Sequence, residues 1–588
     1  MILAKSLEES LALVDVAQGR RPAQTYIEGG RVINVFSGEV LEANVAIYGQ
    51  RIAYVGGSRA MVGPDTQTID ATGFYLAPGY IDPHFHPDTY CNPHTAAMAV
   101  LPHGTTTIFS NSSYLPRIFD TPDFERFMEE LARLPVRMFS GVPEQKFFQP
   151  QAESYSWDEM DRLLSRPTAF GFNEVGIWTR ILDGDEALLK KIMLSRSKGK
   201  KVDGHTAGCS YDKLNAVAAA GITSCHESLV ATEALDRLRL GFWVLLRESS
   251  TRPDLEHLLP TIIKEKVNTN RLCFTTDGLT APDMVKRGHL DYLVKKAITM
   301  GVEPVTAYRM ASLNVATYHG LDGDLGGIAP GRFADILLLR DLNDPTPHLV
   351  IAGGATAARD GELLVEFPVP MYYNYAHNRH GEPGKIEQVH PEMFFVPATG
   401  EDVLFPVMEV RNAVINRRVD RQIPVKDGYF QPGPEDDLMK VAMVNRQTGQ
   451  VTTAFMSNFG ARVGGIASTE NAAYQMLVLG CSEDDMAMAV NRALEMKGGV
   501  VIADGGKLVH EMALPLGGLM SEEPVPVLAS KVDAMNEFLA SRGFKLGDPY
   551  YFFSFLPSTF FPDLRLTTEG LFDVKKAEIL RPPRQVAS

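Results

Sequence analysis

Two histidines separated by one residue, His84 and His86, are the first side chains in the sequence whose spacing suits a metal ion. Residues i and i+2 of a β-strand point to the same side, so both imidazoles can reach one cation if this segment is a strand. With 14 histidines in 588 residues, such a pair also arises by chance. The pair therefore indicates a metal site only if further ligands lie nearby.

Four more metal-binding side chains end other β-rich runs of the sequence. Imidazoles and carboxylates together suit divalent ions such as Zn, Fe, Mn or Co. A carboxylate placed between two ions can bridge them, and such a pair activates water for attack. We therefore predict a centre of two divalent metal ions with these ligands: His84, His86, Glu174, His205, His226 and Asp277.

The rhythm of residues 75–320 explains how side chains so far apart in the sequence would meet. Short β-rich runs alternate with helical stretches, which is typical of βα units and a parallel sheet. Eight such units in ~250 residues match a (β/α)8 TIM-type barrel, whose active site lies where the carboxyl ends of the strands converge. The predicted strands end near His84, Ser110, Ser140, Glu174, His205, His226, Glu248 and Asp277.

Other β-rich segments flank this barrel. Residues 25–55 alternate as short antiparallel strands, and residues 326–339 read as strand, turn and strand. We interpret residues 1–74 plus 321–367 as one composite β-sandwich domain, 75–320 as the barrel, and 403–588 as an additional C-terminal α+β domain. The fold class predicted is α/β.

Composition limits the partners and the location of the protein. The formal net charge of −15 disfavours nucleic acid as a partner. No stretch approaches the ~18 apolar residues of a membrane-spanning helix, and charged residues interrupt any signal peptide. The five cysteines are widely spaced, which disfavours a disulfide framework or a zinc ribbon. We expect a cytoplasmic protein with a small-molecule substrate and no membrane partner.

Longer motifs surround the candidate ligands. Residues 78–86 read PGYIDPHFH and residues 327–335 read GIAPGRFAD, which resembles the opening and closing signatures of the amidohydrolase superfamily. Within it, residues 203–205 (DGH), 225–228 (CHES), 246–248 (LRE) and 514–521 (LPLGGLMS) resemble the adenine deaminase family. The likeness covers nearly the whole chain, including the C-terminal domain.

The resemblance implies a role for each predicted ligand. His84 and His86 would bind the first ion, and His205 and His226 the second. Glu174 would bridge both ions. Asp277 would bind the first ion and take a proton from the bridging water, which makes Asp277 and Glu174 the predicted catalytic residues. Barrels of this kind often self-associate, so a homo-oligomer is expected.

The sequence also departs from the family pattern at four places. Asp88 stands where the family has Glu, and Gly278 where it has a second Asp. Residues 111–114 (NSSY) replace Asp-Pro-His-Glu, and residues 471–474 (NAAY) replace His-Asp-Ser-His. Since a pocket that hydrogen-bonds one substrate rejects analogues, we expect a substrate other than adenine. The predicted substrate contacts are Asp88, Ser113, Glu227, Arg247 and Glu248; for the last three, structural ion pairs are the alternative.

Three functions are compatible with these observations. The first is an adenine-deaminase-like aminohydrolase, which cleaves a C–N bond of a purine-like ring through a hydroxide activated by the binuclear metal centre. The second is an amidohydrolase that opens a cyclic amide or cleaves an N-acyl bond with the same centre. The third is a non-catalytic binding protein on a retired amidohydrolase scaffold. We also hypothesise that the C-terminal domain caps the barrel mouth.

Overall fold

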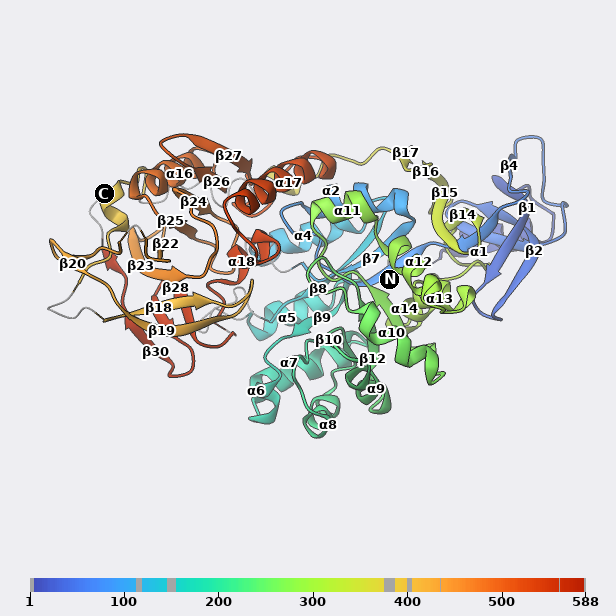
Figure 1. Ribbon diagram of the computed structural model, residues 1–588. Helices are drawn as coiled ribbons and strands as arrows, with labels where there is room; N and C mark the ends of the chain where they lie inside the picture. The colour runs from blue at the N-terminus through green and yellow to red at the C-terminus, as the bar shows by residue number, and fades with distance from the viewer. Residues whose placement is uncertain are drawn as a thin grey trace.

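The computed structural model describes residues 5–112, 119–144, 155–374, 386–398, 404–433, 435–559 and 561–585. One predicted substrate contact, Ser113, lies outside the described residues. Figure 1 shows three parts in a row, with a β-rich part built from both sides of the barrel sequence at one end and the C-terminal part at the other. The barrel lies between them. No helix in the described ranges is long and apolar enough to cross a membrane.

Eight parallel strands form the central barrel, as the alternating pattern predicted. They pair as two arcs, β6 to β10 and β11 to β13. Backbone hydrogen bonds join the arcs: Thr223 N donates to Val202 O at 3.4 Å, and Asp277 N donates to His84 O at 3.1 Å. The strands are β6 (Tyr80–Phe85), β7 (Thr105–Ser110), β8 (Arg137–Val142), β9 (Ala169–Val175), β10 (Lys201–Gly204), β11 (Ser224–Cys225), β12 (Trp243–Arg247) and β13 (Leu272–Thr275).

The interior of the barrel is a packed core. Phe109, Phe139 and Phe170 come from three neighbouring strands and belong to one buried cluster with Leu245 from the other arc. These apolar side chains fill the barrel interior and so support the polar side chains at the carboxyl ends of the strands. Around the barrel lie α2 (Pro93–Val100), η1 (Leu101–His103), α4 (Thr121–Leu131), α5 (Trp157–Leu164), α6 (Thr179–Leu182), α7 (Glu186–Ser197), α8 (Tyr211–Ala220), α9 (Ala231–Arg239), α10 (Leu255–Lys264), η2 (Thr269–Arg271), α11 (Ala281–Arg287), α12 (Leu290–Thr299), α13 (Pro304–Met310) and α14 (Leu313–His319).

A nine-stranded sheet unites the segments before and after the barrel. Its order is β17-β16-β15-β14-β5-β1-β2-β3, with β4 beside β1, so the antiparallel β5–β14 pair joins the two segments. Hydrophobic side chains of both segments share one core, and α1 (Leu7–Ala17) packs nearby. The domain boundaries stay a prediction. The strands are β1 (Thr25–Asn34), β2 (Glu39–Tyr48), β3 (Arg51–Gly56), β4 (Gln67–Asp70), β5 (Tyr75–Pro78), β14 (Ile336–Asp341), β15 (Asp344–Ala352), β16 (Ala355–Arg359) and β17 (Glu362–Leu363).

A second nine-stranded sheet forms the core of the C-terminal part, in the order β19-β18-β23-β22-β25-β24-β26-β27, with β31 beside β23. Helix α16 buries Met486, Val490 and Ala493 in a core shared with this sheet, and these residues recur at the spacing of one helical face. The elements are η3 (Pro391–Phe394), β18 (Leu404–Val410), β19 (Asn416–Gln422), β20 (Val425–Lys426), β21 (Tyr429–Phe430), β22 (Met439–Val444), β23 (Gln450–Ser457), β24 (Gly465–Ser468), β25 (Met476–Gly480), α16 (Glu483–Glu495), β26 (Gly499–Ala503), β27 (Leu508–Ala513), α17 (Val525–Ser541), α18 (Pro549–Phe555), β28 (Leu564–Thr567), β29 (Gly570–Asp573), β30 (Glu578–Arg581) and β31 (Arg584–Gln585).

The C-terminal part contacts the barrel through α17, α18 and the segment before them. Ser521 N donates to Tyr90 O at 2.6 Å, and Asn92 Nδ2 donates to Ser521 O at 2.7 Å. Lys286 of α11 pairs with Asp533 of α17 at 3.0 Å. These contacts surround the loops that follow β6 and β13, so the C-terminal part meets the barrel beside its mouth.

Candidate metal centre

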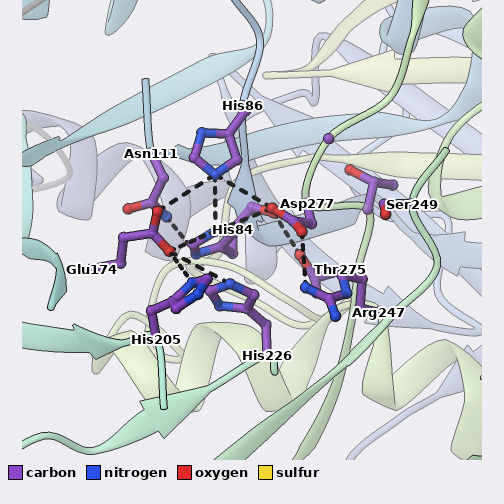
Figure 2. Close-up of polar contacts among 12 residues, drawn as sticks. His84, His86, Asn111, Glu174, His205, His226, Arg247, Ser249, Thr275 and Asp277 are labelled. Carbon is purple, nitrogen blue, oxygen red and sulfur yellow. Dashed lines mark hydrogen bonds and ion pairs between the residues drawn. The ribbon is translucent and has the colours of Figure 1, made fainter. Parts of the chain in front are cut away.

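The mouth of the barrel gathers all six predicted ligands. They come from the carboxyl ends of β6, β9, β10, β11 and β13, or from the residues directly after them, and Figure 2 shows them facing one another. Parallel strands of a closed barrel all end at one face, so side chains distant in the sequence become neighbours there. The ligand atoms belong to groups whose members lie within 4.8 Å of one another.

His84, His86 and Asp277 form the first ligand group. The two Nε2 atoms are 3.2 Å apart, and Asp277 Oδ1 lies 3.5 Å from the first and 3.3 Å from the second. Two donors that each bind one ion at ~2.0–2.2 Å are separated by roughly 3.0–3.6 Å in tetrahedral or octahedral coordination. The three separations therefore fit a single divalent cation.

His205, His226 and Glu174 form the second group. Glu174 Oε2 lies 3.3 Å from His205 Nδ1 and 3.5 Å from His226 Nε2. The carboxylate of Glu227 also reaches these imidazoles, at 3.7 Å and 3.4 Å. Sequence reasoning assigned Glu227 to the substrate; its position directly after His226 was the available signal for a place in this group.

Glu174 lies between the two groups. Its Oε1 is 4.0 Å from His86 Nε2 and its Oε2 is 3.8 Å from His84 Nε2. One carboxylate that faces both groups is the arrangement that a bridging ligand requires. The donor set thus fits two divalent cations, with Glu174 shared between them.

Charge balance in this cluster favours cations. Burial opposes protonation of His205, but Glu227 and Glu174 outweigh it and raise the pKa of this imidazole to about 9. Burial also opposes ionisation of Glu174, yet His205, His84 and His226 hold the pKa of its carboxyl well below the usual range. An imidazole must be neutral to bind a metal, so cations entering here would displace protons and supply the same positive charge.

Asp203, one of the residues that sequence reasoning did not assign, orients His84. The Nδ1 atom of His84 lies 2.7 Å from Asp203 Oδ2, and Ser224 donates to the other Asp203 oxygen. An Nδ1–H donated to a carboxylate leaves Nε2 with its lone pair toward the cation. The amide nitrogen of Asn111 lies 2.8 Å from the same Nδ1 and 3.4 Å from Asp203 Oδ2. The signal for Asp203 was its place two residues before His205.

The seam between β6 and β13 positions Asp277. Its φ is 56°, in the left-handed region that few side chains adopt, and His86 N donates to its carbonyl at 2.8 Å. Thr275 Oγ1 contacts His84 O at 2.5 Å and Asp82 Oδ1 at 2.8 Å. Burial raises the pKa of Asp82 to about 6, although hydrogen bonds from Thr276 and the His84 backbone oppose this. These bonds tie both strands of the first ligand group together.

Arg247, at the end of β12, lies between two carboxylates of the site. Its Nη1 contacts Glu227 and donates to Asp277 Oδ2 at 3.2 Å, and its Nε donates to Asp254 at 2.9 Å. Only 2% of this side chain is exposed. Burial would raise the pKa of Asp277, but hydrogen bonds with His84 and His86 and the charges of His226 and Arg247 hold it well below the usual range. Arg247 adds to the effect of these histidines on the Asp277 carboxylate and orients its Oδ2.

Two further predicted substrate contacts, Glu248 and Asp88, have partners within the protein. Glu248 accepts a hydrogen bond from Lys296 at 2.6 Å, and the two residues form an ion pair that joins β12 to α12. Asp88 is buried and accepts from Ser112 Oγ at 2.6 Å. Their roles toward a substrate stay predictions.

Comparison with known sequences agrees with this site. The sequence pattern of the amidohydrolase family matches residues 75–357, and that of the adenine deaminase C-terminal domain matches residues 413–578. Curated relatives include an adenine deaminase of Moorella thermoacetica, 35% identical over 96% of both chains. Another, from Cenarchaeum symbiosum, is 33% identical over 96% of this chain and 93% of the relative.

The chain belongs to the adenine deaminase family of amidohydrolases. It is therefore a metal-dependent hydrolase that acts on carbon–nitrogen bonds, as the sequence motifs predicted. Among solved structures, an adenosine deaminase from Xanthomonas campestris with bound zinc is 16% identical, with a TM-score of 0.45 over 60% of this chain and 95% of that one.

Proposed function

We propose that this family member uses two divalent metal ions to hydrolyse a C–N bond of a purine-like heteroaromatic ring other than adenine, with release of ammonia. The observation that carries the proposal is the position of the Glu174 carboxylate, which lies within 4.0 Å of His84 and His86 on one side and within 3.5 Å of His205 and His226 on the other. His84, His86 and Asp277 would hold one ion, and His205 and His226 the other. When bound, such ions supply a water activated for attack at neutral pH.

Asp277 is the residue that we assign to proton transfer. Its Oδ1 faces the two histidines of the first group, and its Oδ2 accepts from Arg247. An ionised carboxylate so oriented can accept a proton from the attacking water and pass it to the leaving nitrogen, acting first as base and then as acid. Arg247 would keep the carboxylate in this orientation.

The proposal of a substrate other than adenine rests on polar groups that are engaged within the protein. The amide of Asn471 donates to Ser468 O and Gln475 O within its own loop. The amide of Asn111 lies against His84 and Asp203. Gly278 brings no side chain. A pocket that lacks the family's polar side chains at these positions recognises adenine poorly. Each polar atom of the substrate left without a hydrogen-bond partner costs binding free energy.

The test pairs metal analysis with a substrate panel. We expect about two equivalents of transition metal, loss of metal in His84→Ala and His205→Ala, and ammonia release from an aminopurine such as 2,6-diaminopurine or guanine faster than from adenine. Fast turnover of adenine would contradict the substrate proposal. Turnover only of cyclic amides such as dihydrouracil would favour the ring-opening alternative, and a reconstituted protein that binds no metal would favour the retired scaffold.

A further inference from the structure

Helix α18 of the C-terminal part brings one tyrosine to the metal centre. The hydroxyl of Tyr551 donates to Gly278 O at 3.3 Å, and Gly278 directly follows the predicted proton acceptor Asp277. Tyr551 is separated from Asp277 by more than 270 positions in the sequence, so only the packing of the two parts places them together.

Residue 278 faces the Tyr551 hydroxyl. A methyl group added to Gly278 would lie 3.1 Å from the phenol oxygen, with no other heavy atom of the described residues, its chain neighbours aside, within 4 Å. Tyr551 is itself only partly buried. The Tyr551 hydroxyl therefore lies against residue 278, the direct neighbour of the predicted proton acceptor Asp277.

Helix α18 is held firmly enough to position this hydroxyl. Asp548 caps the helix by accepting from Tyr550 N at 2.9 Å, and the ring of Tyr550 packs edge-on against Tyr90 at 4.5 Å. Ser554 Oγ donates to the buried carboxylate of Glu470 at 3.0 Å, and the backbone carbonyl of Ser554 accepts from Ala472 N at 3.0 Å. The loop of residues 469–474 thus fixes the position of α18 through these hydrogen bonds.

We propose that the Tyr551 hydroxyl hydrogen-bonds the heteroaromatic substrate and determines which ring is accepted, so that the C-terminal part completes the active site. A phenol hydroxyl donates one hydrogen bond and also accepts through its oxygen. Donation to Gly278 O uses the hydroxyl proton, so the phenol oxygen would act toward the substrate as an acceptor, which suits an N–H group of the ring or of its exocyclic amine. This inference rests on the proposed function.

The test compares Tyr551→Phe with Tyr550→Phe, which removes the neighbouring hydroxyl and leaves the ring on Tyr90. The probe is the best substrate from a panel of adenine, 2,6-diaminopurine, guanine, cytosine, dihydrouracil and hydantoin. We expect kcat/KM of Tyr551→Phe to fall roughly 3- to 15-fold, the range of one neutral hydrogen bond, chiefly through KM. The ratio of kcat/KM between panel members should change, while metal content stays at the wild-type value and Tyr550→Phe stays within about twofold.

Gly278→Ala supplies a second arm, because its methyl group would press on the Tyr551 hydroxyl. We expect it to lose activity as Tyr551→Phe does, and the double variant to lose no more than the single variants, because both act on one contact. Wild-type kinetics in Tyr551→Phe, or losses that multiply in the double variant, would overturn the inference. If the wild-type protein turns over no member of the panel, the proposed function fails, and the inference fails with it.

Discussion

At the scale of single residues, the candidate metal centre is a buried cluster of charged side chains, in which the negative carboxylates need positive groups nearby. Four carboxylates lie among four imidazoles: those of Glu174, Asp203, Glu227 and Asp277. Arg247 is a permanent cation that contacts two of these carboxylates, Glu227 and Asp277. The histidines, Glu174 and Asp277 could be predicted from the sequence, because side chains at the carboxyl ends of barrel strands meet at one face. The sequence did not predict that Arg247 would lie between Glu227 and Asp277, because that contact depends on side-chain conformations from three different strand ends.

Arg247 supports a prediction at this scale. Arg247→Met leaves Glu227 and Asp277 without their cation in a buried site, and breaking a buried pair costs about 3–5 kcal/mol. We expect the free energy of unfolding to fall by roughly this amount and kcat/KM to fall at least ~100-fold.

Denaturant unfolding and steady-state kinetics would measure both effects. Arg239→Met is the matched control, because Arg239 is 63% exposed and pairs with Asp236 on the surface of α9. Such pairs contribute about 0–1 kcal/mol. An Arg247→Met protein as active as this control would remove the assigned role.

At the scale of elements, the eight strands, and which strand ends carry the metal ligands, could be predicted because β-rich runs alternate with helical stretches. Even the short β11 (Ser224–Cys225) matches one of the predicted β-rich runs, the run that ends at His226. The partners of the strand ends were not predictable. Glu248 ends the LRE motif of residues 246–248 and was predicted to contact substrate or to form a structural ion pair, and its carboxylate contacts Lys296 of α12.

The Glu248–Lys296 pair can be tested as an element contact. The Glu248 side chain is 1% exposed and that of Lys296 14%. If the pair serves to fasten β12 to α12, Glu248→Gln and Lys296→Met should each lower the free energy of unfolding by about 1–3 kcal/mol, with KM unchanged. Thermal unfolding and kinetics on the same preparations would decide. A changed KM with unaltered stability in Glu248→Gln would restore the predicted substrate role.

At the scale of the whole molecule, the metal centre stands where the arcs of the barrel close and where the C-terminal part approaches. Ions that bind only the folded chain stabilise it by mass action, by about 2.7 kcal/mol at 100 times the dissociation constant. Chelation should therefore lower the Tm, and Zn or Mn should restore it. Differential scanning calorimetry of metal-free, reconstituted and His84→Ala proteins would measure this. Equal Tm values for the metal-free and reconstituted wild-type protein would contradict a resident centre.

Self-association also belongs to this scale, and the homo-oligomer stays a prediction. Sedimentation of the metal-loaded protein would measure its mass directly. A monomer would contradict the expectation drawn from barrels of this kind.

The sequence by itself determined the family, the barrel and the types of metal ligand. Parallel strands end on one face, so a histidine or carboxylate at each strand end already implies a shared site. Only the tertiary structure decided which groups support those ligands. The contacts of Asp203 with His84, of Arg247 with Asp277 and of Tyr551 with Gly278 join segments 119, 30 and 273 residues apart. They depend on side-chain conformations and on the packing of α18 against the barrel, and local sequence patterns do not specify which residues these side chains contact.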